Sequence, residues 1–281
     1  MKTSSAMRSL AELEPICQKP GFRLHGNWMA RRVARPAALR VTRLILPWEV
    51  GANGVTLTAL LVGLAAAAAL ANGSRAGLVG GALLLQLWYL LDHVDGQVAR
   101  YRGTASLTGV YLDYLMHYVV HAACPFGLGW GLFVQTGDPL WILAGASWSL
   151  GATLLGLATD CRLKAFFQRL KWLEGAHRVQ GGGACRPGPA AAPPTLGRPF
   201  RFASYLAQKV GEMHVIMNLL GALALVSVLS PEAAGRGAAG LVALLAVLTP
   251  AVAVVRIIRA VAQGLPEREF AQWFPEIERR D

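Results

Sequence analysis

Long apolar segments separated by short polar stretches dominate the chain from residue 55 to residue 255. Six such segments stand out: 55–71, 77–95, 109–134, 140–159, 215–230 and 237–255. A helix needs about 20 residues to cross the hydrocarbon core of a bilayer. The first and fifth segments are short by this measure, so their ends are placed only to within several residues. The pattern predicts an all-α integral membrane protein with six transmembrane helices.

Composition and charge support this prediction. Of the 281 residues, 54% are hydrophobic and 15% are charged, whereas a soluble domain usually carries about 25% charged residues. The formal net charge is +11. The basic residues lie between apolar segments, which disfavours nucleic acid as a partner and favours loops that face anionic lipid. The four cysteines form no CxxC pair, so neither a disulfide framework nor a zinc site is expected.

The distribution of basic residues predicts the orientation of the chain. With the N-terminus inside, the outer loops are 72–76, 135–139 and 231–236, and they hold only Arg75 and Arg236. All the rest of the 27 Lys and Arg residues then lie on the cytoplasmic side or at its boundary. Because cytoplasmic loops carry an excess of Lys and Arg, we expect both termini in the cytoplasm and the protein in the inner membrane.

Three polar regions flank or interrupt the membrane domain, which we place at 50–262. Residues 1–49 form a basic extension, and its stretch 26–48 interleaves arginines with Trp28 and Trp48 although Pro36 interrupts the stripe. We expect this stretch to lie on the inner leaflet; a solvated basic tail is the alternative. The cytoplasmic loop 161–212 begins with a basic, helix-like run to Trp172. It continues through Gly181–Gly183 and Pro187–Pro194, which we expect to be mobile, and 263–281 is a cytoplasmic tail.

Acidic residues at the edge of two apolar segments are the candidate chemistry. Asp92 and Asp95 are three residues apart, and Asp113 and His117 are four apart, so each pair lies on one face of a helix. The connection between the two helices is short, which predicts antiparallel neighbours whose polar groups converge. Three carboxylates repel one another unless a cation neutralises them, and Mg²⁺ or Mn²⁺ takes oxygen ligands of this kind.

The spacing of these residues resembles the signature of the CDP-alcohol phosphotransferase family, D-x2-D-G-x2-A-R-x8-G-x3-D-x3-D. Seven positions match: Asp92, Asp95, Gly96, Ala99, Arg100, Gly109 and Asp113. The family also has a P-N-x-[IV]-T-like start to its first span, which Asn53–Thr56 resembles, with Ala52 in place of proline. The resemblance covers roughly residues 50–262, apart from the long loop, and leaves out the N-terminal extension.

The resemblance implies an enzyme of phospholipid biosynthesis. It would transfer a phosphoalcohol, such as a phosphatidyl group, from a CDP-linked donor to an acceptor alcohol and release CMP. CDP-diacylglycerol is the expected donor, the site would face the cytoplasm, and a homodimer is expected. Asp92, Asp95 and Asp113 would hold two Mg²⁺ or Mn²⁺ ions. The positions implied for substrate are Gly96, Ala99 and Gly109 around the cytidine, Arg100 at the diphosphate, and Asn53 and Thr56 at the start of the first span.

The chain departs from the signature at its last position, where His117 replaces a fourth aspartate. The resemblance implies that the family's aspartate at this position acts as a general base and as a ligand to the second metal. A neutral imidazole serves in either role, so His117 is the candidate base and a candidate ligand. One fewer negative charge predicts a weaker second metal site. The alternative is a catalytically impaired member of the same fold that only binds CDP or lipid.

Neighbouring polar residues receive separate interpretations. His121 either orients His117 or packs against a neighbouring helix, and His93 is expected to lie outside the site. Asp160 is expected to be a helix-end charge at the interface. Arg256 and Arg259 are expected to reach lipid phosphates, and contact with an anionic acceptor is the alternative. A membrane prenyltransferase is disfavoured because no second acidic motif appears, and a transporter because the cluster lies at one face of the membrane. The sequence leaves the acceptor alcohol open.

Overall fold

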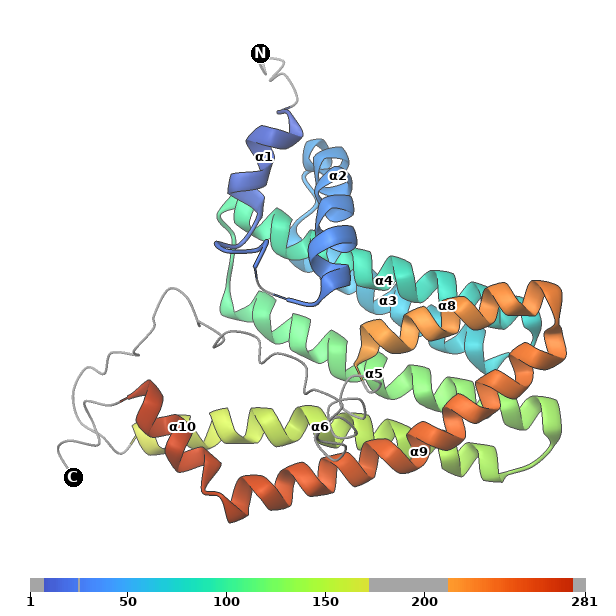
Figure 1. The fold of residues 1–281 in the computed structure, drawn as a ribbon. Helices are drawn as coiled ribbons and strands as arrows, with labels where there is room; N and C mark the ends of the chain where they lie inside the picture. The colour runs from blue at the N-terminus through green and yellow to red at the C-terminus, as the bar shows by residue number, and fades with distance from the viewer. Residues whose placement is uncertain (1–7, 25, 172–211, 275–281) are drawn as a thin grey trace, which may run out of the picture.

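The structure, a computed structural model, describes residues 8–24, 26–171 and 212–274, and within these ranges it contains helices and no strands (Figure 1). The helices of the N-terminal extension are α1 (Leu10–Cys17), the π-helical η1 (Ala30–Ala34), α2 (Arg35–Ile45) and the 3-10 turn η2 (Leu46–Trp48). The long helices are α3 (Ala52–Ala71), α4 (Arg75–Arg102), α5 (Leu107–Thr136), α6 (Leu140–Leu170), α8 (Met213–Leu229) and α9 (Pro231–Ala262). The short α10 (Leu265–Trp273) follows them.

Each predicted apolar segment corresponds to one long helix, and most of these helices extend beyond the apolar run. Polar capping residues help to set the true ends. The hydroxyls of Ser74, Ser106 and Ser230 accept hydrogen bonds from backbone N–H groups three residues further on, which satisfies donors that have no partner inside the helix. Helix α4 therefore begins directly after Ser74 and runs through the whole acidic motif to Arg102.

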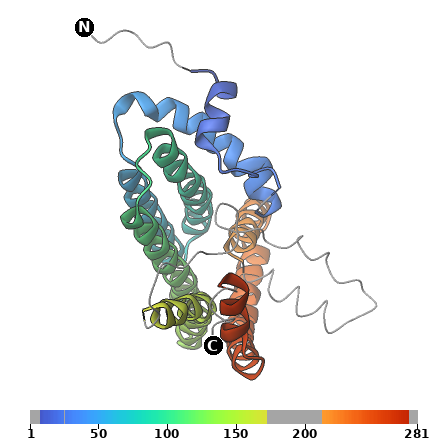
Figure 2. The same cartoon turned by 90° about the vertical axis from the view of Figure 1, so that its left-hand side faces the viewer.

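The long helices pack side by side into a bundle (Figure 1). Helix α3 packs against α4 and α5, α6 packs against α5 and α9, and α8 packs against α4 and α9. Large side chains from several helices fill the core, including Leu85, Trp88, Val120 and Trp148, none of which is more than 1% exposed. Figure 2 shows α1 and α2 lying across one side of this bundle.

Glycines allow α3 and α5 to approach closely. A Cβ atom at Gly127 would lie 2.5 Å from the carbonyl oxygen of Ala67, and one at Gly131 would lie 2.2 Å from that of Leu70. Real Cβ atoms do not come this near to backbone atoms. Close contacts between small residues are a common way of joining membrane helices, and this one fixes the helix that carries Asp113 and His117.

Four of the described helices, α3, α4, α6 and α9, are long and apolar enough to cross a membrane. Helix α8 is apolar but has only 17 residues, which gives it a length of about 25 Å. Helix α5 is long but is not among the four, and it carries polar side chains such as Asp113, His117 and His121. Of the two helices that carry the candidate chemistry, α4 is thus among the four and α5 is not, and six spans remain a prediction.

The N-terminal extension contains more helix than its composition indicated. Helix α1 was not predicted; Ser9 and Glu12 form a capping box at its start. Pro36 does not end the following helical segment, since the π-helical η1 runs directly into α2 and Pro36 is the second residue of α2. The buried face of α2 packs on α4, and Thr42 Oγ1 donates to Gln97 Oε1 over 2.9 Å.

The fourth long helix continues past the predicted end of its apolar segment. The basic run that begins at Arg162 is the last part of α6 and ends at Leu170. This end of α6 is tied to α10, since Arg162 pairs with Glu269 over 2.9 Å and Phe166 contacts Phe270 edge-on. The predicted mobile stretches Gly181–Gly183 and Pro187–Pro194, Trp172, and the tail from residue 275 lie outside the described residues.

Candidate active site

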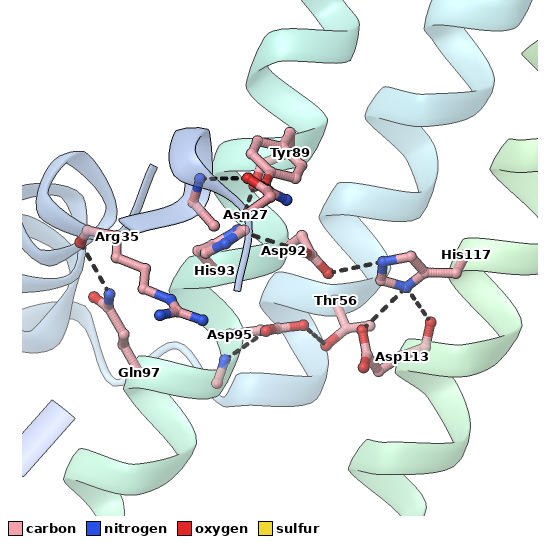
Figure 3. Close-up of polar contacts among 12 residues, drawn as sticks. Asn27, Arg35, Thr56, Tyr89, Asp92, His93, Asp95, Gln97, Asp113 and His117 are labelled. Carbon is pink, nitrogen blue, oxygen red and sulfur yellow. Dashed lines mark hydrogen bonds and ion pairs between the residues drawn. The ribbon is translucent and has the colours of Figure 1, made fainter. Parts of the chain in front are cut away.

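The acidic motif of α4 and the polar face of α5 point toward each other (Figure 3). Both helices pack against α3, and the short connection between them makes them antiparallel. Asp92, Asp113 and His117 each offer one ligand atom to a group in which all such atoms lie within 4.8 Å of one another. The convergence that the spacing predicted is therefore present for these three residues.

The two ring nitrogens of His117 have different surroundings. Nδ1 lies 2.9 Å from the backbone carbonyl oxygen of Asp113 and 3.3 Å from its carboxylate, so it carries the proton and donates. Nε2 lies 3.3 Å from Asp92 Oδ1. With Nδ1 protonated, the lone pair on Nε2 faces a carboxylate oxygen, and two acceptors repel. Either a proton on Nε2 or a cation between the two groups relieves this repulsion.

Asp95 is held apart from this group by its own hydrogen bonds. Its side chain is 7% exposed. Oδ2 accepts a 2.7 Å hydrogen bond from Thr56 Oγ1, and Oδ1 accepts one from the backbone N–H of Gly96. Thr56 comes from α3, so its hydroxyl fixes the carboxylate from the neighbouring helix. Asp95 is therefore a preorganised carboxylate that does not share the ligand group of Asp92, Asp113 and His117.

Two adjoining cavities surround the acidic motif, with volumes of about 310 Å³ and 250 Å³. They share Lys19, Asp95, Gly96, Arg100 and Asp113. The first also reaches Asp92 and His117, and the second reaches the predicted substrate positions Asn53, Thr56, Ala99 and Gly109. Every residue that the sequence nominated thus lines one or both cavities.

The small residues of the motif leave space in two different ways. A Cβ at Gly109 would lie 3.3 Å from Asn53 Oδ1, so the glycine allows α5 to approach the start of α3. A Cβ at Gly96 would lie 3.1 Å from Nη1 of Arg100. In this structure the Arg100 guanidinium therefore occupies the space above Gly96. Its Nε donates to the carbonyl oxygen of Cys17 over 2.5 Å.

The N-terminal extension contributes site residues that the sequence did not indicate. Gln18, Lys19 and Arg35 line the larger of the two cavities, and Lys19 also lines the smaller one. The contact between Arg100 and the Cys17 carbonyl brings this segment over the end of α4. No spacing pattern connects residue 19 with residue 95, so only the fold reveals this arrangement.

His93 differs from the expectation that it lies outside the site. It lines the same cavity as Asp92, and its Nδ1 lies 3.4 Å from Asp92 Oδ2 and 2.9 Å from the carbonyl oxygen of Tyr89. Residue 93 is adjacent to residue 92 on the helix, so the ring turns back along α4 towards Tyr89, which its ring contacts edge-on. Asp92 is thereby flanked by imidazoles from two helices (Figure 3).

A third cavity of about 560 Å³ adjoins the cluster on the side of α6, α8 and α9. It shares Asp113 and His117 with the first cavity and is also lined by His121, Asp160 and Arg256. Asp160 accepts a 2.7 Å hydrogen bond from Tyr118, and Nε2 of His121 is buried without a hydrogen-bond partner among the described residues. Arg256 also lines this cavity, which fits the alternative in which it meets an anionic acceptor, whereas Arg259 is exposed.

The donor set fits a divalent cation. Two carboxylates and one imidazole converge, and the imidazole is oriented by donating its other N–H to a backbone carbonyl, an arrangement typical of metal-binding histidines. Oxygen ligands of this kind suit Mg²⁺, and Mn²⁺ also accepts imidazole. Arg100 and Lys19 add positive charge at the same cavities, which suits a ligand with several negative charges.

Comparison with known proteins supports the resemblance for one part of the chain. Residues 50–165 match the family model of CDP-alcohol phosphatidyltransferase. These residues are thus similar to a CDP-alcohol phosphatidyltransferase domain, and they make up less than half of the chain. The match contains the whole acidic motif and Asn53–Thr56, and it confirms the resemblance on which the site residues were nominated. The N-terminal extension, α8 and α9 lie outside the matched part of the chain.

The fold of the chain is similar to that of a solved structure. The chain is similar to the crystal structure of phosphatidylinositol phosphate synthase from Mycobacterium tuberculosis in its apo form, with 20% sequence identity and a TM-score of 0.50. The similarity covers 79% of this chain and 94% of that one, so it extends the shared fold beyond the matched domain. No curated protein matches the chain at the sequence level.

Proposed function

We propose that this protein transfers a phosphoalcohol group from a CDP-linked donor to an acceptor alcohol and releases CMP. The observation that carries the proposal is the group of Asp92, Asp113 and His117, whose ligand atoms lie within 4.8 Å of one another inside the part of the chain that matches the phosphatidyltransferase family model. The donor is CDP-diacylglycerol, and the reaction belongs to phospholipid biosynthesis. The acceptor is left open.

The cavities support this assignment by their chemistry. A CDP-linked donor carries a diphosphate, and Arg100 and Lys19 line both cavities beside the acidic motif. The smaller cavity, with Asn53, Thr56, Ala99 and Gly109, would take the cytidine. The larger one, with Asp92 and His117, would take the diphosphate. The opening next to Asp113 and His117 towards the third cavity would admit the acceptor.

The reaction needs one bond to form and one to break. The acceptor hydroxyl oxygen bonds to the phosphorus of the group that is transferred. The bond between that phosphorus and the bridging oxygen of the diphosphate breaks, and CMP leaves with the electron pair. The proton of the hydroxyl goes to Nε2 of His117, whose Nδ1 is already engaged with the carbonyl of Asp113. Arg100 offsets the charge that develops on CMP.

Asp92, Asp95 and Asp113 would hold two Mg²⁺ or Mn²⁺ ions. When bound, such ions neutralise the diphosphate and the leaving group. His117 is a candidate ligand as well as the candidate base. Only its Nε2 is available, because Nδ1 donates to a backbone carbonyl, so one imidazole does not serve as ligand and base at the same moment. This favours a second metal site with fewer protein ligands than the first.

A binding-only protein is the second candidate function. The observation in its favour is the imidazole at the last motif position, where Nε2 lies 3.3 Å from Asp92 Oδ1. If Nε2 is protonated, this contact is an ion pair that neither accepts a proton nor binds a metal. Such a protein would bind CDP or lipid in the same cavities without transferring the phosphoalcohol.

Release of CMP is the experiment that tests the proposal. Purified full-length protein in lipid would receive CDP-diacylglycerol, a pool of alcohol acceptors, and Mg²⁺ or Mn²⁺. We expect CMP release that stops when a chelator removes the metal. If neither CDP-diacylglycerol nor CDP-choline-type donors give CMP while CDP still binds in calorimetry, the transferase proposal is wrong and the binding-only function is correct.

We propose six spans with both termini and the site on the cytoplasmic side of the inner membrane, a membrane domain at 50–262, and a homodimer. Thiol labelling tests the orientation. Cys161 is exposed, whereas Cys17 and Cys124 are buried, and burial raises the pKa of the Cys17 thiol. In a Cys185→Ser background, a membrane-impermeant reagent should label Cys161 in inside-out vesicles and spare it in intact cells. Labelling in intact cells would reverse the orientation.

A further inference from the structure

A groove with a volume of about 580 Å³ lies between α1 and the segment that contains η1 and α2. Of its lining residues, only Gln18 also lines the larger cavity at the acidic motif. Leu10 and Glu14 of α1 form one wall together with Gln18, which directly follows the helix. The groove is therefore built by the N-terminal extension alone, away from the phosphatidyltransferase chemistry.

Arginines dominate the lining of this groove. Arg23, Arg31, Arg32 and Arg40 line it, and Glu14 is the one acidic residue among the lining residues. Glu14 is already paired, since Arg23 Nη2 lies 2.7 Å from its Oε1. Arg40 Nη1 donates to the carbonyl oxygen of Pro36 over 3.2 Å within its own helix. The positive charge of the groove is thus not balanced by the residues that line it.

Arg31 carries the clearest sign of a missing anion. Its Nε is buried and has no hydrogen-bond partner among the described residues. A buried donor without an acceptor destabilises the folded protein. Arg31 also lies one helical turn before Arg35, and like charges at this spacing destabilise a helix. An anion in the groove would supply the acceptor and reduce the repulsion.

The other walls of the groove indicate which anion fits. Guanidinium groups bind phosphate oxygens through paired N–H donors, so phosphate chemistry matches the arginines. Trp28, 66% exposed, lines the groove next to them, and Trp48, 74% exposed, lies further along the same segment. Exposed tryptophans beside arginines are typical of a membrane interface. A ligand with a phosphate head and an apolar body suits these walls.

We propose that the groove between α1 and α2 binds the phosphate headgroup of an anionic phospholipid, with Arg31 and Arg32 as its principal partners. The bound lipid holds the N-terminal extension on the membrane surface. It is separate from the donor and the acceptor, so the site does not depend on the proposed transferase function. Because Gln18 and Lys19 follow α1, a lipid here also stabilises the segment that reaches the acidic motif.

Lipid retention in native mass spectrometry tests this site. The full-length protein in detergent, with chelator and no CDP-linked donor, would be titrated with phosphatidylglycerol or phosphatidylcholine. We expect Arg31→Gln to weaken retention of one phosphatidylglycerol about tenfold and Arg40→Gln to weaken it less. Arg43→Gln is the matched control, because Arg43 lies on α2 with Arg40, has a buried Nε without a partner among the described residues as Arg31 does, and does not line the groove.

Several outcomes would overturn the proposal. Equal retention by the Arg31 and Arg43 variants would remove the groove as the binding site. Equal retention of phosphatidylcholine and phosphatidylglycerol would remove the selectivity for an anion. Displacement of the lipid by millimolar inorganic phosphate would show that phosphate alone, and not a phospholipid, is the ligand. If Arg31→Gln does not fold, the comparison of Arg40→Gln with Arg43→Gln decides the question.

Discussion

His117 Nε2 lies 3.3 Å from Asp92 Oδ1, while its Nδ1 lies 2.9 Å from the carbonyl oxygen of Asp113 one turn earlier. The second contact fixes the proton on Nδ1, and the first leaves one nitrogen to face a carboxylate. A fourth aspartate at this position would add a negative charge and would lack a fixed donor. The histidine therefore changes the charge of the site but keeps one acceptor atom in the same pocket.

Replacing His117 tests what that nitrogen does. We expect His117→Ala to lower kcat for CMP release about 100-fold, since a positioned general base contributes about 10²–10⁴-fold. His117→Asp should retain more activity than His117→Ala and need less Mg²⁺ for half-maximal rate, because the added carboxylate strengthens the second metal site. Initial rates across a Mg²⁺ titration measure both quantities. Wild-type rates in His117→Ala would exclude a base at this position.

Substitution of Asp95 should lower activity strongly, although Asp95 lies outside the ligand group of Asp92, Asp113 and His117. Its carboxylate is buried, and Thr56 donates to it over 2.7 Å from a different helix. We expect Asp95→Asn to abolish metal-dependent turnover and Thr56→Val to lower it about tenfold, because Thr56 orients the carboxylate. Glu232→Gln is the control, since Glu232 is 87% exposed. Retained turnover in Asp95→Asn would contradict the metal assignment.

Metal binding should be visible without any turnover. Asp92 and Asp113 repel each other unless a cation lies between them, and a bound ion stabilises the folded protein by mass action. We expect millimolar Mg²⁺ or Mn²⁺ to raise the melting temperature of the wild type by several degrees. The increase should disappear in Asp92→Asn and Asp113→Asn, as followed by thermal unfolding in detergent. The same increase in all three proteins would show that the ions bind elsewhere.

The positions of the long helices could be predicted because the hydrophobicity of the sequence alone indicates them. A run of apolar residues between polar loops has one stable form in a bilayer, and each of the six runs is a helix here. The convergence of Asp92 with Asp113 and His117 was predictable for a similar reason, since spacings of three and four residues put side chains on one face. A short connection then brings the two faces together.

The parts that depend on long-range contacts were not predictable. Helix α1 has eight residues, too few to be stable alone, and it is held by the burial of Leu13 and Cys17 against other elements. Lys19 reaches the acidic motif only because of that packing. Arg256 lines the third cavity because α9 packs on α6, which no local pattern in the sequence records.

Lys19 should act on donor binding and leave the chemistry unchanged. It lines both cavities at the acidic motif but belongs to the N-terminal extension. We expect Lys19→Met to raise KM for the CDP-linked donor about fivefold with little change in kcat, because an exposed ammonium contributes to binding before and during the reaction alike. Lys171→Met, at the end of α6, is the control. A fall in kcat at unchanged KM would assign Lys19 to the transition state instead.

The contact between α3 and α5 gives a prediction in which two similar substitutions change stability in opposite directions. Alanine is favoured over glycine inside a helix by about 1 kcal/mol, so Gly240→Ala should leave the melting temperature unchanged or raise it, as no atom lies within 4 Å of its new Cβ. Gly127→Ala should lower it by several degrees, because the added Cβ would lie 2.5 Å from the Ala67 carbonyl. The backbones must then separate, which also displaces the helix that carries Asp113. Thermal unfolding of the two variants in the same detergent measures the difference, and equal melting temperatures would show that this helix contact is looser than described.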